Sequence, residues 1–167
     1  NLVNVRHILV GFEGGTYDEA TGATNYSAAE KDAAKAKVNE ILDAYNAGDK
    51  TEDSFIDLVH DNTDDTGSKE TGGLYENISY DQNYVEPFLT WALDEKRTPE
   101  EVEIIETEYG FHIMYFVEVN EMNYRDLIIS EEMRADDTQK WYDEQLKTVS
   151  TEKKDMKWIK LDTVIGG

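Results

Sequence analysis

The stretch Arg6-His7-Ile8-Leu9-Val10 and the later stretch Gly110-Phe111-His112-Ile113-Met114 share one unusual feature. Each sets a single histidine among branched or aromatic apolar residues, a composition typical of a buried β-strand. A lone histidine in such a strand is usually a core residue with satisfied hydrogen bonds. Two of them, far apart in the chain, favour a polar site that both strands share. Thr107, across the predicted Tyr109-Gly110 turn from His112, could hydrogen-bond within that site.

The segments between these two stretches predict a small α+β domain. Ser27 and Glu30 form a capping box, which begins a helix whose apolar positions repeat at helical spacing as far as Gly48. The order β-α-α-β-α-β-β predicts a four-stranded antiparallel sheet surrounded by helices. The predicted strands are about 3–12, 74–78, 101–107 and 111–119, and the further helices are about 51–60 and 84–94.

A change in charge predicts a boundary near Met122. The excess of acidic residues lies almost entirely before this position, whereas the residues after it are nearly balanced. We therefore expect one domain over 1–122 and an extension over 123–167. The extension is predicted to hold a long helix over 124–148 and a strand-like tail from Met156 to Ile165.

The composition excludes several classes of function. With 37 acidic and 16 basic residues, the formal charge of −21 repels nucleic acid and anionic membrane surfaces. The absence of cysteine excludes a disulfide framework, a thiol nucleophile and thiolate metal sites. No apolar run approaches the roughly 18 residues of a membrane-spanning helix. The chain begins with Asn1, so we expect any export signal or anchor to belong to upstream sequence.

The polar loop over 61–73 raises the possibility of calcium binding, which its spacing does not support. Started at Asn62, the loop has Gly73 at position 12, where an EF-hand needs a bidentate glutamate. His60 has no partner at a spacing typical of metal ligands. We interpret the loop as a solvated acidic segment and expect neither a metal ion nor a cofactor.

Five segments, in order over about residues 3–119, resemble the parvulin-type peptidyl-prolyl cis/trans isomerases. The first strand of that family resembles His7-Ile8-Leu9-Val10, and its closing Thr-x-x-Gly-x-His-Ile motif resembles the residues from Thr107 to Ile113. The three segments between them are Asn62-Thr63-Asp64 for the family's Ser-x-Asp, Gly72-Gly73-Leu74 for its Gly-Gly-Asp-Leu-Gly turn, and Tyr84 to Leu93 for its third helix.

The resemblance implies a site with a polar floor and an apolar pocket. The floor would consist of His7, His112, Asp64 and Thr107, and the pocket for the proline ring of Leu74, Tyr84 and Phe88. The sequence departs from the family in two places. Tyr84 stands where methionine is usual, and the glycine turn lacks its aspartate and has Tyr75 in place of the following glycine.

The chemistry of prolyl isomerisation needs no nucleophile and no metal, because no bond is broken. The barrier of roughly 18–20 kcal/mol arises from the double-bond character of the C–N bond. A catalyst must bind the twisted amide better than either planar form. We therefore expect non-covalent catalysis on unfolded or partly folded proline-containing polypeptides. The resemblance also implies an exported bacterial folding factor that works outside the cytoplasm.

The loop after the first strand predicts that catalysis does not depend on phosphorylation. Some parvulins carry basic residues here, which select phosphorylated Ser or Thr before proline. Between Ile8 and Glu30 this chain has no lysine or arginine, and Glu13, Asp18 and Glu19 would repel a phosphate.

Two further interpretations remain open. Tyr84 and the altered glycine turn also suit a peptide-binding chaperone module that keeps the parvulin fold with little or no catalysis, and a purely structural domain would show neither property. The helix over 124–148 could pack against an N-terminal region of a longer protein, or could form a homodimer.

Overall fold

The computed structural model describes residues 2–121 and 123–148. They divide into two compact units, one that ends at Asp126 and one that begins at Leu127. The first unit contains the whole sheet, and the second contains most of the last helix. The strand-like tail predicted from Met156 to Ile165 lies outside the described residues.

The predicted α+β class is confirmed, with all four strands and the helices in the expected order. Two features were not predicted: a small hairpin before the first helix and a 3₁₀ turn at Lys69–Thr71. The elements are β1 (Val3–Gly11), β2 (Thr16–Asp18), β3 (Ala23–Asn25), α1 (Ala28–Ala47), α2 (Glu52–Asn62), β4 (Leu74–Ile78), α3 (Glu86–Ala92), β5 (Val102–Thr107), β6 (Gly110–Val119) and α4 (Tyr124–Thr148).

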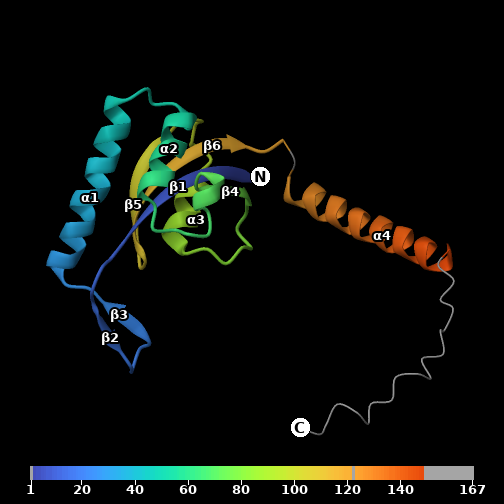
Figure 1. The fold of residues 1–167 in the computed structure, drawn as a ribbon, viewed down its shortest axis with the longest axis horizontal. Coiled ribbons are helices and arrows are strands. Elements are labelled where there is room, and N and C mark those ends of the chain that lie inside the picture. Colours follow the sequence, from blue (N-terminus) through green and yellow to red (C-terminus); the bar gives the residue numbers. More distant parts are fainter. Residues whose placement is uncertain (1, 122, 149–167) are drawn as a thin grey trace, which may run out of the picture. The chain divides into compact units, whose positions relative to one another are not determined.

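The four-stranded sheet is antiparallel and has the order β4-β1-β6-β5, so the two histidine-bearing strands lie side by side at its centre (Figure 1). In the register of β1 and β6, His7 stands opposite Met114 and Leu9 stands opposite His112. The two histidines are therefore diagonal neighbours on one face, a position from which long side chains reach each other.

Each face of the sheet has its own apolar core. Helices α1 and α2 cover one face, where Ile8, Ile113 and Phe55 are almost completely buried (Figure 1). Helix α3 covers the other face, where Phe88 and Trp91 pack against alternate residues of β1 and β6. Full burial of one such side chain contributes about 1.5–3 kcal/mol to the free energy of unfolding. Both histidines lie on the α3 face, beside the second core.

The start of α1 follows the predicted capping box. The Ser27 hydroxyl accepts a hydrogen bond from the Glu30 backbone N–H, and the Glu30 carboxylate accepts one from the Ser27 N–H at 2.7 Å. The other carboxylate oxygen accepts from the Gly15 N–H at 2.8 Å. Glu30 thus connects the beginning of α1 to the chain that enters the β2–β3 hairpin.

Helix α3 is shorter than predicted. It begins at Glu86, because Val85 has an extended backbone and Pro87, which lacks an N–H, occupies the first turn. Tyr84 therefore lies just before the helix.

Helix α4 carries several exposed apolar side chains, among them Ile129, Met133, Trp141 and Leu146. In residues 2–121 and 123–148, no helix has the length and apolar character needed to cross a bilayer.

Candidate active site

The two strand histidines meet. His7 Nδ1 and His112 Nδ1 are 3.0 Å apart, and the two rings are stacked with their centroids 5.2 Å apart. Only 3% of His7 and 5% of His112 is exposed, so both rings are removed from bulk water. The sequence prediction that the two strands share one polar site is consistent with this geometry.

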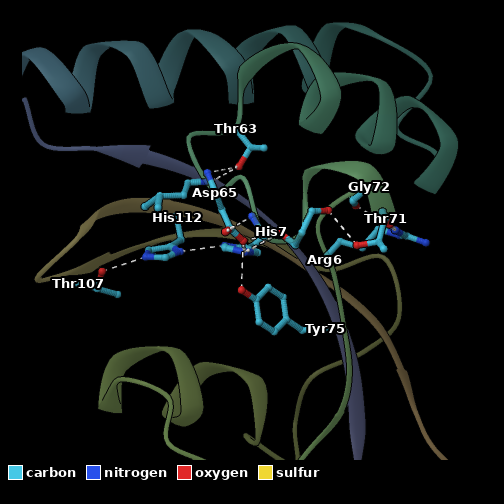
Figure 2. Close-up of polar contacts among 12 residues, drawn as sticks. Arg6, His7, Thr63, Asp65, Thr71, Gly72, Tyr75, Thr107 and His112 are labelled. Atoms are coloured by element: carbon cyan, nitrogen blue, oxygen red, sulfur yellow. Dashed lines mark hydrogen bonds and ion pairs between the residues drawn. The ribbon is translucent and has the colours of Figure 1, made fainter. Parts of the chain in front are cut away.

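The histidine pair is part of a longer row of hydrogen bonds, which Figure 2 shows from Thr107 to Asp65. At one end, Thr107 Oγ1 lies 2.9 Å from His112 Nε2. At the other end, His7 Nε2 lies 3.0 Å from Asp65 Oδ2. Thr107 joins the site as predicted, whereas the carboxylate belongs to the neighbour of the predicted residue.

The acceptor at the end of the row fixes the direction of its hydrogen bonds. An ionised carboxylate can only accept, so His7 donates from Nε2 to Asp65. With His7 neutral, its Nδ1 accepts from His112 Nδ1–H, and His112 Nε2 accepts from the Thr107 hydroxyl. Every ring nitrogen then has one partner of the correct type.

The charges in the row follow from burial and hydrogen bonding. Burial lowers the pKa of His112 to about 3, with a further contribution from His7, so its imidazole is neutral near pH 7. The hydrogen bond from His7, assisted by one from Ser68, holds the pKa of Asp65 well below its ordinary value. The row therefore pairs one fixed negative charge with uncharged His112.

Asp64, the carboxylate predicted for the floor, points elsewhere. Its exposed side chain accepts from the Gly11 N–H at 2.9 Å and lies 4.0 Å from Lys37 Nζ. The reason is the extended backbone beside β1: the Asp64 N–H donates to the Leu9 carbonyl, and successive side chains point in opposite directions. The placement of Asp64 beside the histidines is wrong by one residue, because Asp65 occupies that place.

A hollow of about 220 Å³ opens above the histidines, between α3 and the loop that precedes β4. Its lining includes the two histidines, one carboxylate and three aromatic rings, namely His7, His112, Asp65, Tyr75, Tyr84 and Phe88. The structure thus brings the predicted wall residues Tyr84 and Phe88 to the histidine pair. It does not bring Leu74 there.

Leu74 is replaced in the wall by Tyr75. In the pairing of β4 with β1, Leu74 stands opposite Arg6 and Tyr75 opposite Val5, so the two side chains lie on different faces of the sheet. Tyr75 is on the α3 face with His7. The prediction for Leu74 is therefore wrong. Matched without a gap, the family's Gly-Gly-Asp-Leu-Gly turn places its leucine at Tyr75.

Aromatic contacts make the wall continuous. Tyr84 stacks on Phe88 with ring centroids 5.3 Å apart, and Tyr75 meets Tyr84 edge-on at 5.5 Å. Phe88 in turn meets the His7 ring edge-on at 5.7 Å. Such arrangements are the preferred ones for aromatic pairs. The wall and the polar floor are in direct contact.

Gly73 holds the backbone of His7 in place. Its carbonyl accepts from the His7 N–H at 3.0 Å, and its φ of 71° is one that side chains rarely adopt. A Cβ at this position would stand 2.3 Å from the His7 carbonyl oxygen. The close approach of this backbone to β1 therefore requires glycine at position 73.

Sequence reasoning missed three side chains of the site, namely Asp65, Ser68 and Tyr75. The Ser68 hydroxyl donates to the Asp65 carboxylate, and the backbone N–H of Gly67 donates to the other oxygen at 3.0 Å. The signal for Asp65 is its position two residues after Thr63, whose hydroxyl accepts from the Leu9 N–H. Thr63-Asp64-Asp65, one residue further along than the predicted match, fits the family's Ser-x-Asp segment.

Another hollow of the described residues differs in its lining. A larger hollow of about 510 Å³ lies beside the start of α1, lined by alanines together with Glu13, Glu30 and Lys37, and it contains no histidine. In the part of the chain that the structure describes, no group of three His, Cys, Asp or Glu side chains is placed to hold a metal ion.

Comparison with known proteins identifies the family. The family model for the PPIC-type PPIASE domain matches residues 1–121. This chain belongs to the PPIC-type peptidyl-prolyl isomerases, the parvulins. The parvulin domain is similar to foldase protein PrsA of Clostridium botulinum (strain Langeland / NCTC 10281 / Type F), with 35% identity over 115 residues. That match covers 68% of this chain but 26% of the relative, so the chain spans only a part of the length of its curated relative.

Solved structures show the same fold. The PPIase domain of TBPAR42 matches with a TM-score of 0.53 and 23% identity, over 70% of this chain and 99% of that domain. The peptidylprolyl isomerase PrsA of Bacillus anthracis matches with a TM-score of 0.50 and 19% identity, over 78% of this chain and 47% of that one. The predicted membership of the parvulin family is confirmed by the family model, and the predicted fold by these structures.

Proposed function

We propose that the parvulin domain accelerates rotation about X–Pro peptide bonds without forming a covalent intermediate. The observation that carries this proposal is the row Asp65–His7–His112–Thr107 at the base of a small aromatic hollow. In this proposal Tyr84 and Phe88 hold the proline ring. The histidine row forms a rigid polar surface for the twisted amide. Asp65 takes the role that the sequence had suggested for Asp64.

The energetics suit such a site. Twisting the amide removes its resonance, so a surface that prefers the twisted form lowers the barrier. A million-fold acceleration needs about 8 kcal/mol, at about 1.4 kcal/mol per factor of ten. Exclusion of water by Tyr84 and Phe88 and preorganised groups at the floor both contribute. His112, neutral because of its low pKa, is not an imidazolium acid near pH 7, and the reaction transfers no proton overall.

The test is a proline-limited peptide assay on wild type and three variants. His7→Ala, His112→Ala and Phe88→Ala should each lower kcat/KM at least about tenfold, because each removes a part of the wall or floor. His60→Ala is the matched control, since His60 is exposed on α2 and lies outside the hollow. Circular dichroism on every variant checks that it is folded. Wild-type rates in His112→Ala would contradict the proposal.

We infer that the substrates are unfolded or partly folded proline-containing polypeptides and that the domain works outside the cytoplasm, on exported proteins. The relative of Clostridium botulinum is named a foldase, which supports a role in protein folding. A refolding assay with a proline-limited client tests the substrate class. Fractionation of cells that produce the full-length protein, in secreted, surface and membrane-bound pools, tests the location.

A peptide-binding module with little catalysis is the second candidate. The observation in its favour is the pair Tyr75 and Tyr84, which stand where the family has leucine and methionine, line the hollow and contact each other. Binding of proline peptides by a wild-type chain that does not accelerate isomerisation would favour this candidate. Loss of both properties in the same variants favours the enzyme.

We also propose that residues 123–167 form an extension that packs against another segment of a longer protein or against a second copy of the chain. Support comes from the exposed apolar side chains of α4, including Met133 and Trp141. Mass measurement in solution separates the two possibilities, because only self-association gives a dimer. If the measured mass is that of a monomer at every concentration, the homodimer is excluded.

A further inference from the structure

Tyr75 touches both members of the hydrogen-bonded pair Asp65–His7 at the end of the histidine row. Its hydroxyl donates to Asp65 Oδ2 at 3.1 Å, and its ring meets the His7 ring edge-on with centroids 4.9 Å apart. Figure 2 shows the side chain directed from β4 toward this pair. Tyr75 also contacts Tyr84 and Phe88, at 5.5 and 5.8 Å between centroids. One residue therefore joins the aromatic wall to the polar floor.

The hydroxyl completes the surroundings of the Asp65 carboxylate. Oδ2 accepts from His7 Nε2, from the Ser68 hydroxyl and from Tyr75, while Oδ1 accepts from the Gly67 N–H. A carboxylate with fewer donors can rotate and share its hydrogen bonds with water. With this set of donors its orientation is fixed, and with it the plane and tautomer of His7.

The leucine that stands here in the family's turn could supply the apolar wall but no donor. We propose that Tyr75 is a positioning residue of the isomerase: its hydroxyl orients Asp65, and through Asp65 it fixes His7. Burial, followed by the charge of Asp65, raises the pKa of Tyr75 to about 12, so the hydroxyl remains a donor across the working pH range. The catalytic consequence rests on the proposed function, whereas the consequence for His7 does not.

The experiment compares Tyr75→Phe with wild type by two independent measurements. Phenylalanine keeps the ring against His7 and Phe88 and removes only the hydroxyl. In ¹⁵N spectra of the histidine rings at pH 7, the His7 Nε2 signal should shift and its proton should exchange with water about three- to tenfold faster. In the peptide assay, kcat should fall about three- to tenfold, which is the effect expected from the loss of one hydrogen bond. KM should stay within about twofold of the wild-type value.

Two variants complete the design. Tyr84→Phe makes the same chemical change one ring away and should leave the His7 signals unchanged, because no hydrogen bond joins Tyr84 to Asp65 among the described contacts. Tyr75→Leu restores the family's residue. It should reproduce the shift at His7 and the fall in kcat, and should raise KM because the ring is also lost.

The outcomes separate the two proposals. If Tyr75→Phe unfolds at the wild-type temperature and also has wild-type His7 signals and a wild-type kcat, then Tyr75 is only a wall residue and the inference is wrong. If wild type shows no isomerase activity, the proposed function fails, and the His7 signals alone still decide whether Tyr75 positions the pair. Thermal unfolding of each variant separates local loosening from global destabilisation.

Discussion

His112 is buried as a neutral imidazole, which couples the stability of the domain to pH. Its folded-state pKa is about 3, below the ordinary 6.5. Between these values the unfolded chain binds a proton that the folded chain does not, so the free energy of unfolding falls as pH falls through this window. Asp65, whose pKa is also lowered, adds to the loss only below its ordinary value of 3.8, because its carboxylate is protonated there in the unfolded chain.

Urea unfolding at several pH values between 4 and 7 measures this effect. The slope in wild type should include a contribution of up to about 1.4 kcal/mol per pH unit from His112. His112→Gln should lack this contribution whatever its overall stability, while His60→Gln, an exposed control, should keep the wild-type slope. Equal slopes in wild type and His112→Gln would show that burial of the neutral ring is not the cause.

Single residues also mark the limit of what the sequence could predict. The two histidines can be predicted as site residues because a polar ring in an apolar strand is unusual. The sequence alone does not separate Asp64 from Asp65, or Leu74 from Tyr75, because both neighbours in each pair are chemically acceptable. In extended backbone a shift of one residue moves a side chain to the opposite face. Only the pairing of each segment with β1 decides between the neighbours, and that pairing is set by contacts distant in sequence.

At the scale of elements, the sequence predicts the structure that local signals determine, and it does not predict the structure that lacks such signals. The start of α1 and the central strands depend on local signals, namely a capping box and apolar runs. The strands β2 and β3 of the hairpin have three residues each, and nearly all of these residues are exposed. No apolar pattern therefore predicts this hairpin. The start of α3 lies later than the sequence predicts because the apolar spacing continues back through Tyr84, before the turn that contains Pro87.

Glu30 provides a test of how α1 and the hairpin are connected. Glu30→Ala removes the acceptor for the backbone N–H groups of Ser27 and Gly15, so it should lower the free energy of unfolding and shift the urea midpoint downward. Glu40→Ala is the control on the same helix. Glu40 is exposed in its interior, where alanine is the best helix former, so this change should be neutral or slightly stabilising. Equal effects of the two substitutions in urea unfolding would argue against the connection.

At the scale of the whole molecule, the charge distribution predicts which substrates the domain disfavours. The chain carries a formal charge of −21, and no lysine or arginine lines the hollow. On α1, which covers the other face of the sheet, Lys31 Nζ lies 2.7 Å from the Glu106 carboxylate and Lys37 Nζ lies 4.0 Å from the Asp64 carboxylate. A phosphate on the residue before proline adds a charge of about −1.5 to −2 at pH 7. The phosphorylated peptide would therefore meet repulsion that no cation at the site offsets.

We expect a phosphoserine-proline peptide to be isomerised with a kcat/KM at least about tenfold below that of its unphosphorylated twin in low salt. The difference should narrow as salt is raised from 0.01 M to 1 M, because screening shortens the Debye length from about 30 Å to about 3 Å. A peptide with glutamine before proline is the uncharged control, and its rate should depend little on salt. Faster turnover of the phosphopeptide would reveal a cationic subsite and overturn the expectation, whereas a gap unaffected by salt would assign the discrimination to the size of the phosphate instead of its charge.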